Sequence, residues 1–400
     1  MSNSKIRCLF VHNRYLIRGG EDNVADEEVK LLKQNGHEVH LYEINNLKID
    51  SFRKKIQTGF EITYSPNAKE SLAKELKRFK PDIVHVHNFF PLLTPAIYDA
   101  CIENNIPVIQ TLHNFRLICP GALLLRDGNI CERCITGSPY NAVIHKCYRS
   151  SRLQSLAVAR MVSYHRKNNT WANKVTRFIA LTEFSKSKFV AAGFPSTKIT
   201  VKPNFVNGNT ELEMDSNESD IQNEINRKTY ALYVGRLSKE KGINTLLDAW
   251  ENINFNLNIA GDNMLESQLP TTNSNIKFLG ELSSHEIRTQ MRGAQFLIMP
   301  SICFETFGMV IVEAFSNKIP VIASNLGAMA DIVEHNKTGL LFKAGNSIDL
   351  TNRATYLIEN PQKSKEMGIH AYKLYKDRFT PDRNYDLLIN IYNEAISTIK

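Results

Sequence analysis

Short apolar runs alternate with amphipathic stretches along most of the chain. Apolar residues recur at helical spacing near 69–79 and 243–252, and runs of the buried-strand type lie between such stretches. The clearest of these strands are KIRCLFVH (5–12), DIVHVHN (82–88), IPVIQTLHN (106–114) and QFLIM (295–299). Strands that alternate with helices predict βαβ units, so we expect an α/β fold built on parallel sheets.

The pattern stops once and then restarts, which predicts two domains. Residues 1–204 are expected to form an N-terminal Rossmann-like, doubly wound domain with an insertion at 115–148. A polar, acidic stretch at 205–228 lacks apolar periodicity and predicts a linker or a surface excursion. A second Rossmann-like domain is expected at 229–380, followed by a C-terminal helix at 381–400.

One stretch carries the strongest chemical signal. SICFETFGMVIVEA (301–314) follows the strand at 295–299 and contains Glu305, Gly308 and Glu313. A strand, a glycine turn and a helix start together present free N–H groups, which suit a phosphate. The two carboxylates suit hydroxyl groups instead, so a ligand with phosphates and many hydroxyls fits both demands. An ordinary turn with two solvated glutamates is the alternative.

Two further loops could hold an anion. The loop after the strand TYALYV contains Gly235, Arg236 and Lys241, and two fixed cations beside a backbone turn suit a diphosphate. Near the N-terminus, Gly19 and Gly20 lie between a strand and a helix, where glycine permits positive φ and the close approach of an anion. A charged exposed loop and plain turn chemistry are the respective alternatives.

A histidine lies at the end of one predicted strand. His113 follows the apolar part of IPVIQTLHN, and ligands of open α/β sheets bind at the carboxyl ends of strands. His113 could donate to a phosphate or a sugar hydroxyl, or help to polarise a leaving group. The alternative is a structural histidine that caps the turn.

Four of the seven cysteines lie in the insertion. Cys131 and Cys134 form a C-x2-C pair, with Cys119 before it and Cys147 after it. In a reducing compartment, four thiols at such spacing indicate a tetrahedral structural zinc site, for which His145 could replace one ligand. Free core cysteines or a redox-active pair are the alternatives. A closed zinc site would be architectural and would leave catalysis to other residues.

Composition places the chain among ordinary globular proteins, with 400 residues of which 42% are hydrophobic and 22% charged. No apolar run approaches the roughly 20 residues that span a bilayer. The apolar part of the N-terminal MSNSKIRCLFVHN is too short for a signal peptide. We therefore expect a cytoplasmic protein.

The net charge of +8 is unevenly distributed. Residues 1–204 hold 30 Lys and Arg against 17 Asp and Glu, whereas residues 205–400 hold 19 against 24. Basic segments at 53–55, 74–80 and 149–174 could contact the anionic inner face of a membrane, or could simply be solvated helix faces. Basic and aromatic residues do not interleave as in RNA-binding proteins, so no nucleic-acid partner is expected.

Several motifs in the second half stand in a recognisable order: GRLSKEKG, AGDN, FLGELSSHEI, ETFGMVIVEA, IPVIASNLGAMADIV and TGLLF. With these motifs the chain strongly resembles glycosyltransferase family 4, the glycosyl transferases group 1. The resemblance implies the GT-B fold, in which two Rossmann-like domains face each other across a cleft and the C-terminal helix crosses back to the N-terminal domain. It also implies retaining transfer from a nucleotide diphosphate sugar, with UDP or GDP as the nucleotide and without a metal cofactor.

The resemblance assigns roles to the candidate residues of the second domain. Glu305 would contact hydroxyls of the donor sugar, and Glu313 would hold the ribose. Arg236 and Lys241 would neutralise the departing diphosphate, with Gly235 in the same loop. The backbone that would meet the phosphates belongs to Phe307, Gly308, Met309 and Val310.

Three further positions match the family less fully. His113 matches a histidine near the transferred sugar, and Gly20, with Gly19 beside it, matches a glycine loop near the donor phosphates and the acceptor. Asp262 falls in a GxG-like stretch but is followed by Asn263 in place of the usual glycine. No further carboxylate in these loops is an evident nucleophile, so we favour a front-face mechanism in which a departing diphosphate oxygen helps to deprotonate the acceptor.

The first domain of this family receives acceptors, here expected to be a saccharide or a lipid-linked saccharide in bacterial polysaccharide, capsule or O-antigen synthesis. Four alternatives stay open. The chain could be a nucleotide-sugar epimerase or a phosphorylase of the same fold, or a nucleotide-sugar-binding subunit without activity. It could also be a basic nucleic-acid-binding protein with a zinc knuckle.

Overall fold

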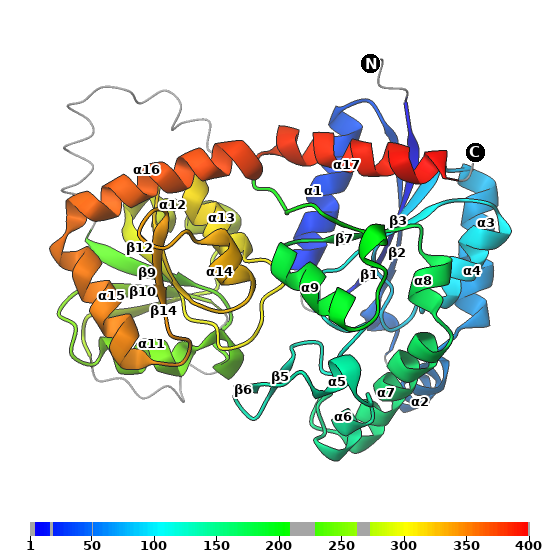
Figure 1. Cartoon of the computed structure of the whole chain (residues 1–400), viewed down its shortest axis with the longest axis horizontal. Helices are drawn as coiled ribbons and strands as arrows, with labels where there is room; N and C mark the ends of the chain where they lie inside the picture. Colours follow the sequence, from blue (N-terminus) through cyan, green and yellow to red (C-terminus); the bar gives the residue numbers. More distant parts are fainter. Residues whose placement is uncertain (1–4, 17–18, 50, 209–228, 262–272, 399–400) are drawn as a thin grey trace. The chain divides into compact units, whose positions relative to one another are not determined.

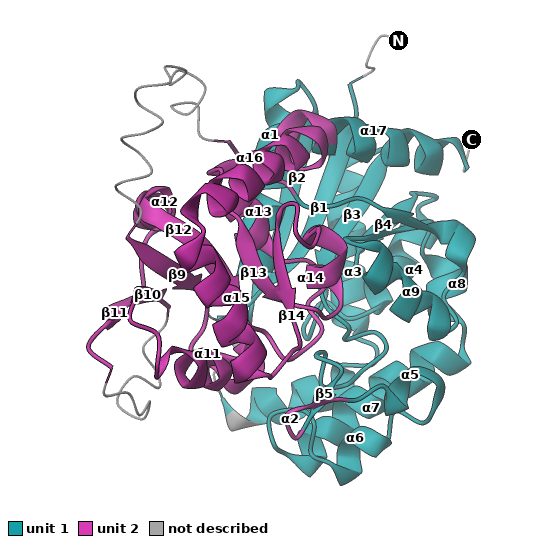
Figure 2. Ribbon diagram, turned by 60° about the vertical axis from the view of Figure 1, so that its left-hand side comes forward, with its two compact units in different colours: residues 1–126, 131–204, 384–400 teal, residues 127–130, 205–383 magenta. Residues whose placement is uncertain are grey.

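The chain folds into two compact units, coloured separately in Figure 2. A computed structural model describes residues 5–16, 19–49, 51–208, 229–261 and 273–398. Unit 1 comprises Met1–Arg126, Cys131–Asn204 and Asn384–Lys400, and unit 2 comprises Asp127–Ile130 and Phe205–Arg383.

Unit 1 is built on a six-stranded parallel sheet in the order β2-β1-β3-β4-β7-β8. Figure 1 labels β1, β2, β3 and β7 of this sheet. Its strands are β1 (Arg7–Arg14), β2 (Glu38–Asn45), β3 (Ile83–Asn88), β4 (Val108–Thr111), β7 (Arg177–Ala180) and β8 (Ile199–Val201). The principal helices are α1 (Gly20–Gln34), α2 (Phe52–Glu61), α3 (Pro66–Phe79), α4 (Ala96–Glu103), α7 (Arg152–Lys167), α8 (Thr170–Lys174) and α9 (Glu183–Ala191). Short 3-10 turns lie at Asn46–Lys48 and Ser196–Lys198.

The insertion after β4 contains only short elements. They are β5 (Leu125–Arg126), β6 (Asn129–Ile130), α5 (Arg133–Thr136) and α6 (Asn141–Ile144), and β5 pairs with β6. Several non-glycine residues here have positive φ, among them Ala122, Leu124 and Lys146. A backbone bent so often cannot continue a regular strand or helix.

Unit 2 has its own six-stranded parallel sheet, in the order β11-β10-β9-β12-β13-β14. Its strands are β9 (Tyr230–Val234), β10 (Asn256–Ala260), β11 (Ile276–Gly280), β12 (Ala294–Met299), β13 (Val321–Ser324) and β14 (Gly339–Phe342). Its helices are η4 (Lys239–Lys241), α11 (Ile243–Trp250), α12 (Ser284–Gly293), α13 (Met309–Ser316), α14 (Ala328–Ile332), α15 (Ser347–Glu359) and α16 (Pro361–Arg378).

The core of unit 2 follows from the two-residue period of its strands. Alternate residues such as Phe296 and Ile298 of β12 point to one face, where α11 and α15 cover them. Trp250, at the end of α11, is fully buried in this layer. Helices α12 and α13 contact β12 as well, so helices cover both faces, as a doubly wound sheet requires.

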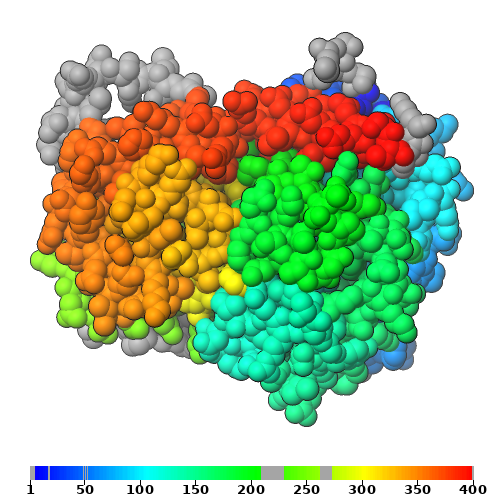
Figure 3. Space-filling model, viewed as in Figure 1, coloured from blue at the N-terminus to red at the C-terminus, as the bar shows by residue number. Residues whose placement is uncertain are grey.

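The C-terminal helix α17 (Pro381–Ser397) belongs mostly to unit 1. Tyr392 accepts a hydrogen bond from the Cys8 thiol at 3.5 Å, and its hydroxyl lies 2.8 Å from His85 Nδ1. Tyr385 bonds to His37 Nε2 at 2.8 Å. The outer side of α17, red in Figure 3, lies on the surface. These contacts confirm that the C-terminal helix packs on the N-terminal domain.

The α/β fold with two Rossmann-like parallel sheets is confirmed, and some element bounds differ from those expected. β1 continues to Arg14, and the basic segment at 149–174 is divided between α7 and α8, because Asn169 adopts a left-handed conformation between them. Helix α2 was not expected. Most of the polar stretch 205–228 lies outside the described residues. No helix within the described part of the chain is long and apolar enough to cross a membrane.

Candidate functional site

The sheet of unit 2 reverses its strand order between β9 and β12. Numbered along unit 2, its strands lie in the order third, second, first, fourth, fifth, sixth. In such sheets ligands bind outside the carboxyl ends of the strands where the order reverses, because the loops there turn to opposite faces. The two loops at this point are residues 235–242, after β9, and 300–308, after β12.

The two loops are held together by their backbones. Gly242 has a φ of +75°, and a Cβ at this position would lie 1.9 Å from the carbonyl oxygen of Pro300. The amide of Ile302 donates to the carbonyl oxygen of Glu240 at 3.0 Å. Only glycine allows so close an approach, so the sequence Lys-Glu-Lys-Gly fixes the first loop against the second.

This approach brings Lys241 and Glu305 into contact. Lys241 Nζ donates to Glu305 Oε1 at 2.7 Å, and Ser301 Oγ donates to the same oxygen at 2.8 Å. Burial raises the pKa of Glu305, but Lys241 and Ser301 lower it further, so its pKa is below the usual value. Burial lowers the pKa of Lys241, but Glu305 more than offsets this and its pKa is raised. Both groups are therefore charged at neutral pH.

Arg236 is the more exposed cation of the first loop. Its side chain is 65% exposed and lies 3.4 Å from Glu240 Oε1. Its carbonyl oxygen accepts a hydrogen bond from the Tyr233 hydroxyl at 2.7 Å. The amide of Gly235 donates to Ala260 O at 3.0 Å, which fixes the start of the loop beside β10. The backbone around Arg236 is thus fixed while its guanidinium reaches solvent.

Helix α13 begins directly after the second loop. Phe307 is buried and Gly308 is the N-cap residue. The amides of Gly308, Met309 and Val310 lie where a helix has no carbonyl one turn back to accept from them. Glu313 lies one turn further on, and burial raises the pKa of its carboxyl group, an effect that Arg288 partly offsets. The second loop thus offers N–H donors and a desolvated carboxyl group on one element.

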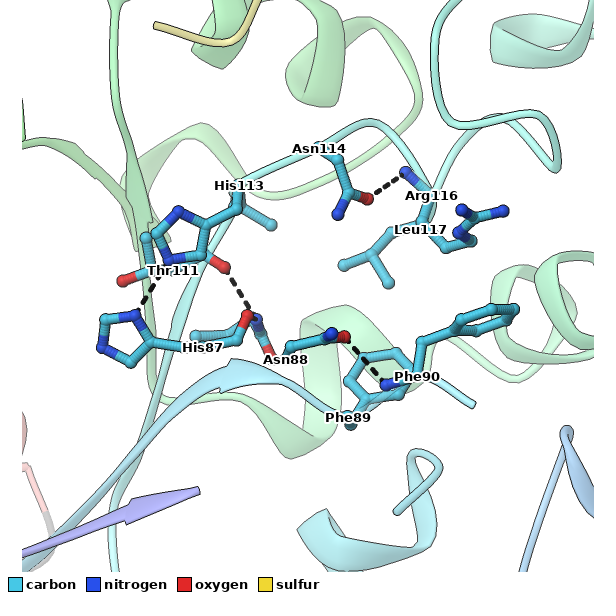
Figure 4. Close-up of a pocket in the computed structure, with 11 residues that line it drawn as sticks. His87, Asn88, Phe89, Phe90, Thr111, His113, Asn114, Arg116 and Leu117 are labelled. Atoms are coloured by element: carbon cyan, nitrogen blue, oxygen red, sulfur yellow. Dashed lines mark hydrogen bonds between the residues drawn. The ribbon is translucent and has the colours of Figure 1, made fainter. Parts of the chain in front are cut away.

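Unit 1 has a pocket at the carboxyl edge of its own sheet, beyond β3 and β4 (Figure 4). His113 lines it, and His113 Nε2 lies 2.9 Å from His87 Nδ1. Burial and the neighbouring His87 lower the pKa of His113 well below its ordinary value, so this imidazole is neutral. The lining residues are His87, Asn88, Phe89, Phe90, Gln110, Thr111, Leu112, His113, Asn114, Arg116 and Leu117.

The start of α1 is connected to this pocket. Glu21 Oε2 accepts hydrogen bonds from Tyr15 at 3.1 Å and from Asn114, a pocket residue, at 3.3 Å. Burial raises the pKa of Glu21 to about 8. Gly19 is extended with a φ of −127° and Gly20 is the first residue of α1, so neither uses the positive φ that the sequence allowed. A Cβ on either would meet nothing within 4 Å.

Two family models match the two halves of the chain. The model described as Glycosyltransferase Family 4 matches residues 18–209, and the one described as Glycosyl transferases group 1 matches residues 215–374. The chain belongs to the group 1 glycosyltransferases.

Curated relatives of this glycosyltransferase are distant. A 2-deoxystreptamine N-acetyl-D-glucosaminyltransferase of Niallia circulans is 22% identical over 86% of this chain and 85% of its own length. A phosphatidyl-myo-inositol mannosyltransferase of Mycobacterium leprae is 28% identical over 48% of this chain and 52% of its own. An uncharacterized glycosyltransferase of Methanocaldococcus jannaschii is 29% identical over 50% of this chain and 60% of its own. The chain therefore spans little more than half of the last two relatives.

Solved structures show the same fold. Anabaena Alr3699/HepE, in complex with UDP and glucose, is 20% identical with a TM-score of 0.66 over 96% of this chain and 98% of that one. Sucrose-phosphate synthase from Thermosynechococcus elongatus is 14% identical with a TM-score of 0.70 over 98% of this chain and 100% of that one. At these identities the likeness supports the GT-B fold of the glycosyltransferase and no particular substrate.

The residues predicted for the donor site fall into three groups. The structure brings Lys241 and Glu305 together, and Gly235 and Arg236 lie on the same loop as Lys241. Phe307, Gly308, Met309, Val310 and Glu313 lie on the adjoining loop and helix, whereas Gly19, Gly20 and His113 lie in unit 1. Asp262 lies outside the described residues. No sequence pattern selected Ser301, His87 or Glu21, although each lies within or next to a predicted motif.

The four cysteines of the insertion lie in one neighbourhood of the glycosyltransferase. Burial raises the pKa of Cys134 to about 12, and the thiols of Cys119, Cys147 and Cys131 each add to the rise. Among the described residues, however, no three of these sulfur atoms lie within 4.8 Å of one another. His145 Nε2 lies 2.9 Å from Arg126 Nη1. The thiols would have to move closer together and lose their protons to bind zinc.

The zinc site stays a prediction that metal analysis can test. We expect purified protein to carry about one zinc per chain, and Cys134→Ser to lose it. Elemental analysis of protein made without chelators measures this, with Cys101→Ala as the control because Cys101 is a buried thiol outside the insertion. Zinc-free wild-type protein, or equal zinc in both variants, would contradict the prediction.

Proposed function

We propose that this glycosyltransferase moves a hexosyl group, with retention of configuration, from a UDP- or GDP-sugar to a saccharide or lipid-linked saccharide. The product would serve bacterial polysaccharide, capsule or O-antigen synthesis at the cytoplasmic face of the membrane. The observation that carries the proposal is the contact of Lys241 with Glu305 where the strand order reverses in unit 2. That contact supports a site in which a cation for a diphosphate lies beside a carboxylate for sugar hydroxyls.

The diphosphate would lie between the first loop and the start of α13. Lys241 and Arg236 supply fixed positive charge, and the amides of Gly308, Met309 and Val310 supply donors. These groups would stabilise charge as the diphosphate departs, which is the part that a divalent cation often plays. Catalysis would then need no bound metal.

The nucleoside and the sugar would each contact one glutamate. Glu313 is desolvated and lies one turn into α13, which suits a carboxylate that accepts from ribose hydroxyls. Glu305 is held in its ionised form by Lys241 and Ser301, so it can accept from hydroxyls of the transferred sugar. UDP and glucose are bound in the Anabaena structure, which supports a nucleotide-sugar donor here.

The chemical step would be a displacement on one face of the sugar. The bond between the anomeric carbon and the diphosphate oxygen breaks as the acceptor oxygen bonds to the same face of that carbon. The acceptor proton passes to the departing diphosphate oxygen, so no enzyme carboxylate becomes covalently attached. Lys241 and Ser301 each donate a hydrogen bond to Glu305, which supports a role in binding over one as a nucleophile.

Replacement of Glu305 tests this proposal. We expect Glu305→Gln to lower donor turnover about 10²- to 10³-fold, because it removes a charged acceptor aimed at the sugar. A thermal-shift panel of UDP-, GDP- and ADP-sugars would first identify the donor, since a ligand that binds only folded protein raises its melting temperature. Release of nucleotide from that donor, with and without saccharide acceptors, would then be measured.

Glu366→Gln is the matched control, because Glu366 is an exposed carboxylate that pairs with Lys363 on α16. This control should turn over donor as the wild type does. Unchanged turnover in Glu305→Gln would refute the role of Glu305. Turnover of the donor to an epimer in the absence of acceptor would instead favour an epimerase.

A surface of unit 1 supports contact with a membrane. Arg160 of α7 donates to the carbonyl oxygen of Phe60, the penultimate residue of α2, at 2.6 Å, and so joins the two helices. Exposed apolar side chains lie on both helices around this contact. We call them the α2–α7 surface: Ile56, Phe60, Leu153, Leu156 and Tyr164.

The charge around the α2–α7 surface is strongly positive. Residues 52–61 and 144–167 together hold nine Lys and Arg but one acidic residue, Glu61. Each basic residue near an anionic membrane surface adds about 1 kcal/mol of attraction, and apolar side chains that enter the interface add hydrophobic burial. Anionic lipid therefore fits both properties of this surface. A lipid-linked acceptor would be reached from the same membrane.

Vesicle binding tests the membrane contact. We expect the wild type to sediment at low salt with vesicles that contain phosphatidylglycerol but not with pure phosphatidylcholine. Exchange of both Phe60 and Leu153 for Ser should abolish this, because their side chains are 70% and 80% exposed. Ile348→Ser serves as control, since Ile348 is 74% exposed but lies on α15 in unit 2. If wild-type protein stays in solution with anionic vesicles, peripheral binding is wrong.

A further inference from the structure

A buried ion pair lies behind the pocket of unit 1. Lys202 Nζ donates to Glu28 Oε1 at 2.6 Å, and both side chains are fully buried. Burial raises the pKa of Glu28, but Lys202 and His87 lower it further and leave it well below its usual value. Glu28 is therefore a carboxylate with one oxygen bonded to an ammonium group.

The other oxygen of Glu28 faces His87. Glu28 Oε2 lies 3.4 Å from His87 Nε2. Within the described part of the chain, neither atom has a hydrogen-bond partner of normal geometry, although both are buried. Two buried polar atoms of this kind satisfy one another only if one of them donates.

Glu28, His85 and His87 have ligand atoms within 4.8 Å of one another, which is close enough to consider a metal ion. Their other contacts argue against one. Both ring nitrogens of His85 already bond, to Tyr392 at 2.8 Å and to Thr111 at 2.7 Å. With Lys202 on one oxygen of Glu28, only two ligand atoms remain, and an ammonium group beside them repels a cation. The cluster suits a proton better than a metal.

Glu28 determines where the protons lie in its contact with His87 and in the contact of His87 with His113. A carboxylate can only accept, so His87 must carry its proton on Nε2. Burial lowers the pKa of His87, so its ring is neutral and its Nδ1 is a bare acceptor. His87 Nδ1 lies 2.9 Å from His113 Nε2, so His113 must donate there (Figure 4).

We infer that Glu28, acting through His87, holds His113 as a neutral imidazole with its proton on Nε2 and with Nδ1 as a hydrogen-bond acceptor. Glu28 and His87 are thus positioning residues for a side chain that lines the pocket. The proton positions rest on the contacts within unit 1 alone.

The consequence for the ligand rests on the proposed function. An unprotonated Nδ1 accepts from a hydroxyl group. It repels the oxygens of an ionised diphosphate, because these oxygens also can only accept. His113 would therefore recognise a hydroxyl group of a ligand in the unit 1 pocket. It would neither bind the diphosphate nor donate a proton to the leaving group.

The proton on His113 can be observed directly in the wild-type protein. In 15N-histidine-labelled enzyme, two-bond 15N–1H correlations distinguish a protonated ring nitrogen from a bare one, and His113→Asn identifies the signal. We expect Nε2 protonated and Nδ1 bare at neutral pH. A proton on Nδ1, or on both nitrogens, would overturn the inference, and this result needs no variant of Glu28.

Glu28→Gln provides a sharper test because it should reverse the two hydrogen bonds that run from Glu28 through His87 to His113. The amide oxygen of Gln must accept from Lys202, which leaves its NH2 group to donate to His87 Nε2. His87 would then donate from Nδ1 to His113 Nε2, and the proton of His113 would move to Nδ1. The control is Glu27→Gln, one residue earlier on α1 with a side chain that is 42% exposed, which should leave the spectrum unchanged.

The outcomes for Glu28→Gln test two claims separately: that Glu28 fixes the proton positions, and that His113 contacts the ligand. If Glu28→Gln folds and His113 keeps its proton on Nε2, Glu28 does not order the chain and the inference is wrong. If the proton moves, donor turnover should fall about tenfold, as expected for a lost hydrogen bond to a ligand hydroxyl. A moved proton with unchanged turnover would refute the contact of His113 with ligand while the ordering by Glu28 is upheld.

Discussion

Parallel strands cannot be joined by tight hairpins, so each connection leaves the same edge of its sheet and returns across a face, usually as a helix. Where the strand order reverses, neighbouring connections turn to opposite faces and leave room between them. In unit 2 this happens between β9 and β12, and the loops that follow these strands hold Lys241 and Glu305. In unit 1 the pocket opens beyond β3 and β4, next to the corresponding reversal. The position of both sites is thus a property of the connections, and the loop residues supply the chemistry.

A Lys–Glu pair lies at or behind each of the two sites, and the two pairs differ in what surrounds them. Lys241 and Glu305 are partly accessible, with side chains 23% and 18% exposed, so a ligand can replace their mutual contact. Lys202 and Glu28 are fully buried, which keeps their contact away from solvent and lets it fix the protons of neighbouring histidines. A buried ion pair is weak evidence for stability, because desolvation offsets most of the attraction. The role of the Lys202–Glu28 pair is to determine which ring nitrogens of the neighbouring histidines donate and which accept.

The sequence was sufficient for the fold and for the positions of the donor loops, because strand periodicity and the Gly-containing turns are local signals. It could not show that Lys241 bonds to Glu305, since the two residues are 64 positions apart and meet only through the close approach of Gly242 to Pro300. Helix α2 escaped prediction because its apolar side chains, Ile56 and Phe60, face solvent and not a core. From the sequence, Glu28 is expected to be a solvent-facing polar residue of an amphipathic helix. Only the folded unit shows that it is buried beside His87.

The central claim is that Lys241 serves the diphosphate while Glu305 serves the sugar. Calorimetric titration of UDP and UMP, or the corresponding guanine pair, into wild-type enzyme and Lys241→Met measures this most directly. The account predicts that Lys241→Met weakens the diphosphate about tenfold or more, as expected for one charge-assisted hydrogen bond, and leaves the Kd of the monophosphate nearly unchanged. The same ratio of the two affinities in both proteins would contradict it.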